Sequence, residues 1–101
     1  MSLIKAGAIG QLPPGEMLEL VHGDRRIAIC NVGGTLHAID GTCPHRQGPL
    51  AQGALHGTAV ACPWHAWEFD CVTGEHDYNP SIKLETFRVE QAGDDILVDI
   101  A

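Results

Sequence analysis

Basic side chains are scarce in this chain of 101 residues. Six Lys and Arg stand against thirteen Asp and Glu, and the formal net charge is −7. Such a charge balance argues against nucleic acid and anionic lipid as partners, because both are themselves negative. It favours a partner with a basic docking face, although many acidic proteins carry their charge only for solubility.

Long hydrophobic runs are also missing. No stretch approaches the roughly 20 apolar residues that a membrane-spanning helix needs. Residues 1–10 contain no basic region followed by a long apolar run, so they do not have the pattern of a signal peptide. We therefore expect a soluble, cytoplasmic protein, and its length suits one domain over residues 1–101.

Helical periodicity is weak throughout the sequence. Short runs with β-forming residues alternate instead with Gly, Pro, Asn and Asp. The expected strands cover residues 3–9, 16–21, 26–32, 35–39, 58–61, 66–70, 84–90 and 96–100. Short strands at this spacing predict an all-β fold, either an antiparallel sandwich or a small barrel.

Two Cys–His pairs lie in the stretches where the strand pattern stops. Residues 40–57 are predicted as a long loop, and such loops inside small domains are usually functional. This loop contains Cys43-x-His45, and Cys62-x-x-His65 follows after sixteen intervening residues. Each pair offers one thiolate and one imidazole, so two neighbouring loops could bring four ligands to a single site.

This ligand set narrows the choice of metal. Two soft thiolates with two imidazoles suit either zinc or an iron–sulfur centre. A closed zinc site would use all four side chains around one ion. In a Rieske [2Fe–2S] cluster, one iron keeps two Cys ligands and the other iron takes two His ligands.

The order and surroundings of the two motifs resemble those of Rieske ferredoxins. The shared features are the two Cys–His pairs, Gly-Pro-Leu at 48–50, Cys-Pro-Trp-His-Ala-Trp at 62–67 and Thr-Gly at 73–74. The resemblance implies a Rieske-type antiparallel β-sandwich with a small cluster-binding subdomain. It implies one [2Fe–2S] cluster on Cys43, His45, Cys62 and His65, carried by loops at about 41–50 and 60–69. A covering loop is expected at about 76–81.

The resemblance also points to one branch of the family. High-potential Rieske proteins have a disulfide between positions that correspond here to Gly48 and Trp64. They carry hydroxyl side chains at positions that correspond to Trp67 and Phe69. Hydrogen bonds from such hydroxyls to sulfur favour the reduced cluster. Their loss predicts a reduction potential in the lower part of the roughly −150 to +300 mV Rieske range.

The function implied by the resemblance is electron transfer. The chain would be the ferredoxin of a bacterial aromatic-ring-hydroxylating dioxygenase system and not itself an enzyme. It would receive single electrons from a flavin- and NADH-dependent reductase and pass them to a terminal oxygenase. One alternative is the small Rieske-type subunit of assimilatory nitrite reductase, and another is a sensing or structural cluster module.

The remaining Cys and His residues lack the spacing of metal ligands. Cys30 and Cys71 are expected to be small packing residues. The histidines expected at the surface or in turns are His22, His37, His56 and His76. Trp67 and Phe69 are expected to pack beneath the ligand loops.

Overall fold

The computed structural model describes residues 3–43, 48–63, 67–79 and 81–100. Within them the chain forms nine strands and two 3-10 helices, which confirms the predicted all-β class. The elements are β1 (Leu3–Ala8), η1 (Ile9–Gln11), β2 (Met17–His22), β3 (Arg25–Val32), β4 (Thr35–Asp40), η2 (Leu50–Gln52), β5 (Ala54–His56), β6 (Ala59–Ala61), β7 (Glu68–Asp70), β8 (Thr86–Ala92) and β9 (Asp95–Asp99). None of the helices in this part of the chain has the length and hydropathy needed to span a membrane.

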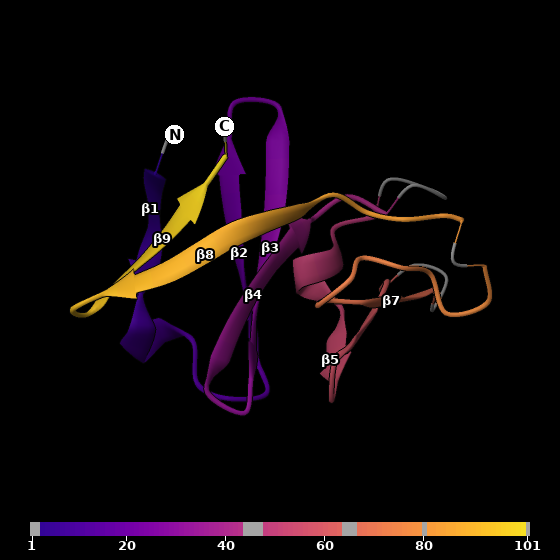
Figure 1. Ribbon diagram of the computed structural model, residues 1–101, viewed down its shortest axis with the longest axis horizontal. Coiled ribbons are helices and arrows are strands. Elements are labelled where there is room, and N and C mark those ends of the chain that lie inside the picture. Colours follow the sequence, from indigo (N-terminus) through magenta and orange to yellow (C-terminus); the bar gives the residue numbers. More distant parts are fainter. Residues whose placement is uncertain (1–2, 44–47, 64–66, 80, 101) are drawn as a thin grey trace.

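The larger sheet has six antiparallel strands in the order β1-β9-β8-β4-β3-β2. Its two halves join where β4 meets β8, through only two residue pairs. Ile96 and Val98 of β9 are buried in the same core as Ile27 and Ile29 of β3. The sheet therefore curls around its own core, and Figure 1 shows β8 crossing β2, β3 and β4.

The smaller sheet consists of β5, β6 and β7 and lies at one end of the molecule (Figure 1). Each pair is antiparallel, with Val60 opposite both Leu55 and Phe69. Val60 and Phe69 are fully buried in a second core that also contains Ala28 of β3 and Ile39 of β4. The small sheet thus packs on the large one, which confirms the predicted β-sandwich with a smaller subdomain.

Two sequence predictions differ from the structure. The long loop expected at 40–57 contains η2 and β5, because residues as far as His56 turn back onto β6 through Gly57. The strand expected at 84–90 begins only at Thr86. Leu84 instead donates its backbone N–H to the carbonyl of Gly74, at 2.7 Å, and so ties this segment to the small sheet.

The hairpin between β3 and β4 shows how a short turn sets the register of the large sheet. Gly33 and Gly34 both have positive φ, at 59° and 99°, as the two-residue turn requires. The buried side chain of Asn31 accepts a hydrogen bond from the N–H of Gly34 and donates one to the carbonyl of Leu12, both at 2.8 Å. This residue fixes the turn at the end of the sheet that lies away from the predicted ligand loops.

Candidate metal centre

The two loops that carry the predicted ligands close in the same way. The backbone N–H of Cys43 donates to the carbonyl of Gly48 at 2.9 Å, and that of Cys62 donates to the carbonyl of Trp67 at 2.7 Å. Each hydrogen bond joins a cysteine to the residue five positions further along the chain. In the sequence, each predicted histidine ligand falls inside the segment that its own cysteine closes.

The thiols of Cys43 and Cys62 belong to one core. Their exposed fractions are 0% and 2%, and both pack in the cluster that joins the two sheets. Neither forms a disulfide. Two buried thiols at the bases of adjacent loops would suit the two cysteine positions of a Cys2His2 ligand set, so they fit a Rieske cluster. His45 and His65, the other predicted ligands, and Trp64 lie outside the described residues.

Backbone hydrogen bonds connect the first loop to the large sheet. Thr42 forms an isolated bridge with Pro49, and Leu50 donates its N–H to the carbonyl of Gly41 at 2.9 Å. Gly41 in turn donates to the carbonyl of Arg26 at 2.8 Å. A Cβ atom on Gly41 would lie 3.0 Å from the backbone of Arg26, so the absence of a side chain permits this close approach.

The second loop starts against the end of the first. A Cβ atom on Gly53, immediately after η2, would overlap the carbonyl oxygen of Ala61. The same atom would lie 3.1 Å from the ring of Pro63, which follows Cys62. Gly53 therefore lets the segment leaving the first loop lie directly on the segment entering the second. Cys43 and Cys62 themselves lie in one buried core.

His76 is buried, which corrects its prediction as a surface or turn residue. It is 7% exposed, and its Nδ1 accepts hydrogen bonds from the N–H groups of Tyr78 and Asn79 at 3.2 and 3.1 Å. The acceptor role of Nδ1 places the ring hydrogen on Nε2. Nε2 is buried and has no hydrogen-bond partner among the described residues.

The ring of His76 anchors the predicted covering segment to the small sheet. Its centroid lies 4.5 Å from that of Trp67 and 5.2 Å from that of Phe69, both in edge-on geometry. Phe69 is fully buried and Trp67 is half-buried beside it, so both pack as predicted. Sequence reasoning missed His76 because its burial depends on partners from another strand. Pro80, in the same predicted segment, lies outside the described residues.

The other residues that were predicted to pack or to lie at the surface do so, except that His37 is only partly exposed. Cys30 and Cys71 are buried, with exposed fractions of 0% and 1%. His22 and His56 are exposed, and His37 on β4 is half-buried. Elsewhere in the described part of the chain, no three Cys, His, Asp or Glu side chains gather as a metal site would require.

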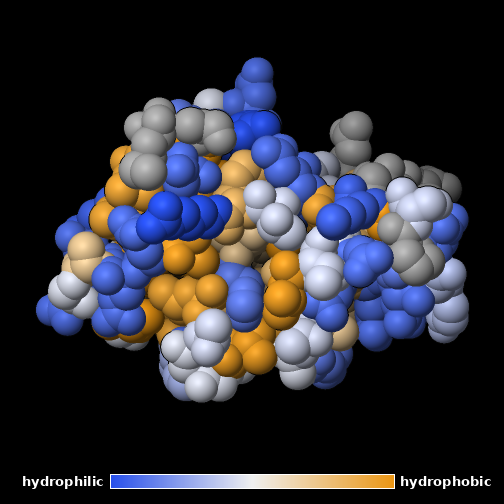
Figure 2. Space-filling view, viewed as in Figure 1, coloured by the Kyte–Doolittle hydropathy of each residue, from blue (hydrophilic) through white to orange (hydrophobic). Residues whose placement is uncertain are grey.

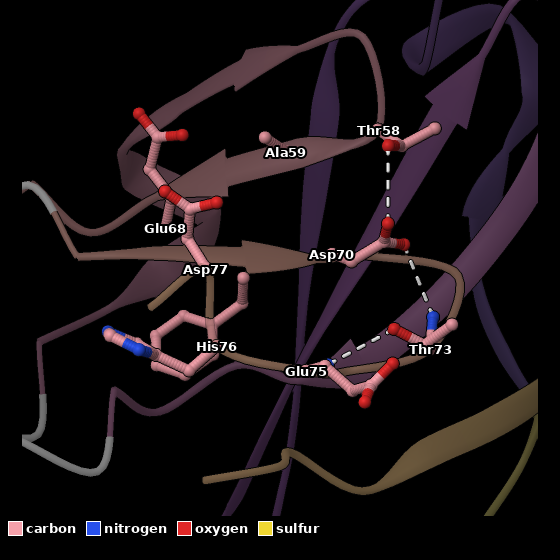
Figure 3. A pocket seen from close by; sticks show the side chains of 9 residues that line it. Thr58, Ala59, Glu68, Asp70, Thr73, Glu75, His76 and Asp77 are labelled. Carbon is pink, nitrogen blue, oxygen red and sulfur yellow. Dashed lines mark hydrogen bonds between the residues drawn. The ribbon is translucent and has the colours of Figure 1, made fainter. Parts of the chain in front are cut away.

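An acidic hollow of about 370 Å³ lies beside the second loop (Figure 3). The carboxylates that line it belong to Glu68, Asp70, Glu75 and Asp77. Asp70 is held by the N–H of Val72 at 2.7 Å and the hydroxyl of Thr58 at 3.4 Å. Figure 3 shows the His76 ring pointing away from Asp70 and Glu75, so these carboxylates do not form an acid–base pair with it.

Comparison with known proteins shows the family of the chain. The model of the Rieske [2Fe–2S] domain family matches residues 2–88. The biphenyl 2,3-dioxygenase ferredoxin component of Rhodococcus jostii (strain RHA1) is 41% identical over 99% of this chain and 94% of its own length.

Solved structures show the same fold. One chain from a complex of reduced oxygenase and oxidised ferredoxin in carbazole 1,9a-dioxygenase has a TM-score of 0.87 and 28% identity, covering 95% of this chain and 91% of its own. A structure assigned as an NADH-dependent nitrite reductase small subunit from Mycobacterium tuberculosis has a TM-score of 0.86. It covers 99% of this chain and 96% of its own, but its 19% identity indicates a shared fold alone. The chain belongs to the Rieske [2Fe–2S] domain family.

Proposed function

We propose that Cys43, His45, Cys62 and His65 hold the single Rieske [2Fe–2S] cluster of this chain. The observation that carries the proposal is the burial of Cys43 and Cys62 at the start of two loops with the same backbone closure. Each loop then contributes one cysteine and one histidine. Electron transfer is the function of this site, and the chain is a ferredoxin component rather than a catalytic oxygenase.

The bound cluster supplies a one-electron redox couple, and two neutral imidazoles make it less negative than an all-cysteine cluster. The chain contributes the protein scaffold that would surround the cluster. Leu50, Val60 and Phe69 are fully buried and exclude water from the inner side of the ligand loops. The N–H groups of Cys43 and Cys62 hold the two loops closed.

The proposed partners are a flavin- and NADH-dependent reductase, which donates the electron, and a terminal ring-hydroxylating oxygenase, which accepts it. The oxygenase–ferredoxin complex among the similar structures supports the second step. We propose that this exchange takes place in the cytoplasm, where NADH is available as the electron source. Encounters between redox partners are usually small and short-lived, so we expect weak docking.

The charge of the chain fits basic docking faces on these partners. The net charge is −7, and the acidic hollow lies beside the second ligand loop. Figure 2 shows that hydrophilic side chains dominate the end of the molecule formed by the small sheet, while apolar residues gather over the large sheet. Association should therefore slow as the salt concentration rises.

The alternative function is that of a nitrite reductase small subunit. It is supported by similarity of fold. The relative with 41% identity is instead a dioxygenase ferredoxin component, and this favours the first assignment. A mixing experiment separates the two: reduced protein should reoxidise when a ring-hydroxylating oxygenase is added, and it should not co-purify with a sirohaem subunit.

Electron paramagnetic resonance of the reduced protein tests the ligand assignment. Wild-type protein, reconstituted anaerobically with iron and sulfide, should show a Rieske signal. His45→Gln and His65→Gln should each abolish it, whereas His56→Gln changes an exposed histidine of β5 and should leave it intact. A colourless wild-type protein without acid-labile sulfide would indicate zinc and overturn the proposal.

A further inference from the structure

Cys30 and Cys71 form a second cysteine pair, apart from the predicted ligands. Cys30 lies on β3 of the large sheet, and Cys71 follows β7 of the small sheet. Both are buried in the core between the sheets, and a side-chain hydrogen bond joins the two thiols. Electron transfer through the cluster uses neither residue.

The backbone on both sides of this pair is fixed. Cys30 lies within β3, paired with Met17 on one side and His37 on the other. Cys71 donates its own N–H to the carbonyl of Thr58 at 2.8 Å. The turn that contains Cys71 is closed by the N–H of Gly74 on the carbonyl of Asp70, at 2.6 Å. Backbone hydrogen bonds on both sheets therefore hold the two thiols in their positions at the interface between the sheets.

The two thiols are not equivalent. The hydrogen bond to Cys71 raises the pKa of Cys30, and burial raises it further because a thiolate is poorly solvated there. The same hydrogen bond lowers the pKa of Cys71, whose thiolate would accept it. A thiolate is the reactive form of cysteine, so Cys71 is the nucleophile of the pair.

Cys71 is only 1% exposed, but it borders a hollow in the surface. This residue lines a hollow of about 260 Å³ whose wall is formed by residues of β4 and β8, among them His37 and Phe87. Cys30 is not among the lining residues. Cys71 is therefore the thiol nearer to this hollow, and a small oxidant that enters it would meet Cys71 before Cys30.

We propose that Cys30 and Cys71 form a reversible dithiol–disulfide site that hydrogen peroxide oxidises. The sulfur of Cys71 attacks one peroxide oxygen, the O–O bond breaks, and one water leaves, so that Cys71 becomes a sulfenic acid. The sulfur of Cys30 then attacks that of Cys71, the S–O bond breaks, and a second water leaves. The two thiols lose two electrons and two protons, and one peroxide is reduced to two waters.

The disulfide would join the two sheets covalently. The closed segment runs from residue 30 to residue 71 and includes both ligand loops. A cross-link of this length restricts the unfolded chain, so the oxidised protein should melt at a higher temperature than the reduced one. Oxidation at this site would stabilise the cluster-binding end without touching a predicted ligand.

Peptide mapping of the holoprotein tests the proposal. The protein is treated with hydrogen peroxide, its remaining thiols are alkylated, and it is cleaved before aspartate. Cleavage at Asp24, Asp40, Asp70 and Asp77 places Cys30 in peptide 24–39, Cys71 in 70–76, and both predicted ligand cysteines in 40–69. We expect a linked 24–39/70–76 species, lighter by two hydrogens than the separate peptides, which dithiothreitol reverses while the Rieske signal persists.

Two single variants assign the roles. In Cys30→Ala, Cys71 should accumulate sulfenic acid that dimedone traps. In Cys71→Ala, Cys30 should be alkylated in full after the same treatment. The proposal is overturned if both wild-type peptides carry free thiols, or if cross-links arise only within 40–69 as the cluster is lost. Because the wild-type map decides this alone, a variant that fails to fold does not obscure the result.

Discussion

The imidazole of His76 stands edge-on to the indole of Trp67, with ring centroids 4.5 Å apart and ring planes inclined by 61°. Trp67 closes the second ligand loop through its carbonyl, and His76 holds the N–H groups of Tyr78 and Asn79. This one contact therefore connects the predicted covering segment to the loop that carries Cys62.

Replacing His76 separates its two roles. His76→Phe keeps a ring against Trp67 but removes the acceptor for two N–H groups, so we expect the free energy of unfolding to fall by about 1–3 kcal/mol. His76→Asn keeps an acceptor close to the Nδ1 position and removes the ring. Hydrogen exchange should then be faster at Tyr78 and Asn79 in His76→Phe than in His76→Asn, and equal rates would contradict this account.

Gly74 and Gly57 form a matched pair for substitution by alanine. Both have positive φ, at 81° and 63°, but a Cβ atom on Gly74 would overlap the carbonyl of Leu84, whereas Gly57 faces open space. Gly57→Ala should cost only the backbone strain, about 1–2 kcal/mol. Gly74→Ala should add about 1–3 kcal/mol for overpacking. Urea denaturation measures both, and similar midpoints would refute the steric argument.

The reduction potential should respond to hydroxyl groups beneath the second loop. Wild-type protein should have a potential in the lower part of the roughly −150 to +300 mV range, and Trp67→Ser with Phe69→Tyr should raise it. Phe87→Tyr adds the same hydroxyl to β8, in the large sheet, and should leave the potential unchanged. Protein-film voltammetry measures all three, and a wild-type value well above zero would defeat the prediction.

Removal of the cluster should loosen one end of the molecule more than the other. The loops at Cys43 and Cys62 then lose their shared ligand, while the strand pairs of the large sheet remain. We expect amide exchange to quicken at Cys43, at Cys62 and across β5 to β7, with little change in β3 and β9. Mass spectrometry of protein before and after chelation would show this, and uniform quickening would mean that the two sheets unfold as one unit.

Much of this fold could be predicted from local patterns. The strands of the large sheet are short apolar or alternating runs bounded by turn residues, so their expected bounds fall within two residues of those observed, as for β3 and β4. β5 was missed because three residues between glycines show no periodicity. The start of β8 was misplaced because Leu84 pairs with the distant Gly74, a contact that no local signal reveals.

The residues of the candidate site also fall into two groups: those that sequence patterns indicate, and those whose contacts arise only when the chain folds. Motif spacing indicated Cys43 and Cys62, and the structure brings them into one core. Burial of His76 depends on Trp67 and Phe69 across the small sheet, so its isolated position in the sequence suggested a surface residue. The contact between Cys30 and Cys71 likewise arises only when the two sheets pack, because these residues are far apart in the chain.

The glycine at position 53 has a consequence for the rate of electron exchange. Backbone so close that no methyl group fits between Gly53 and Ala61 cannot be compressed further, so displacement of either segment is transmitted to the other. The segment that follows η2 and the segment that leads into Cys62 should therefore shift together when the charge of the centre changes. A scaffold that is linked in this way favours a small rearrangement at each electron transfer, which suits a carrier that alternates repeatedly between two oxidation states.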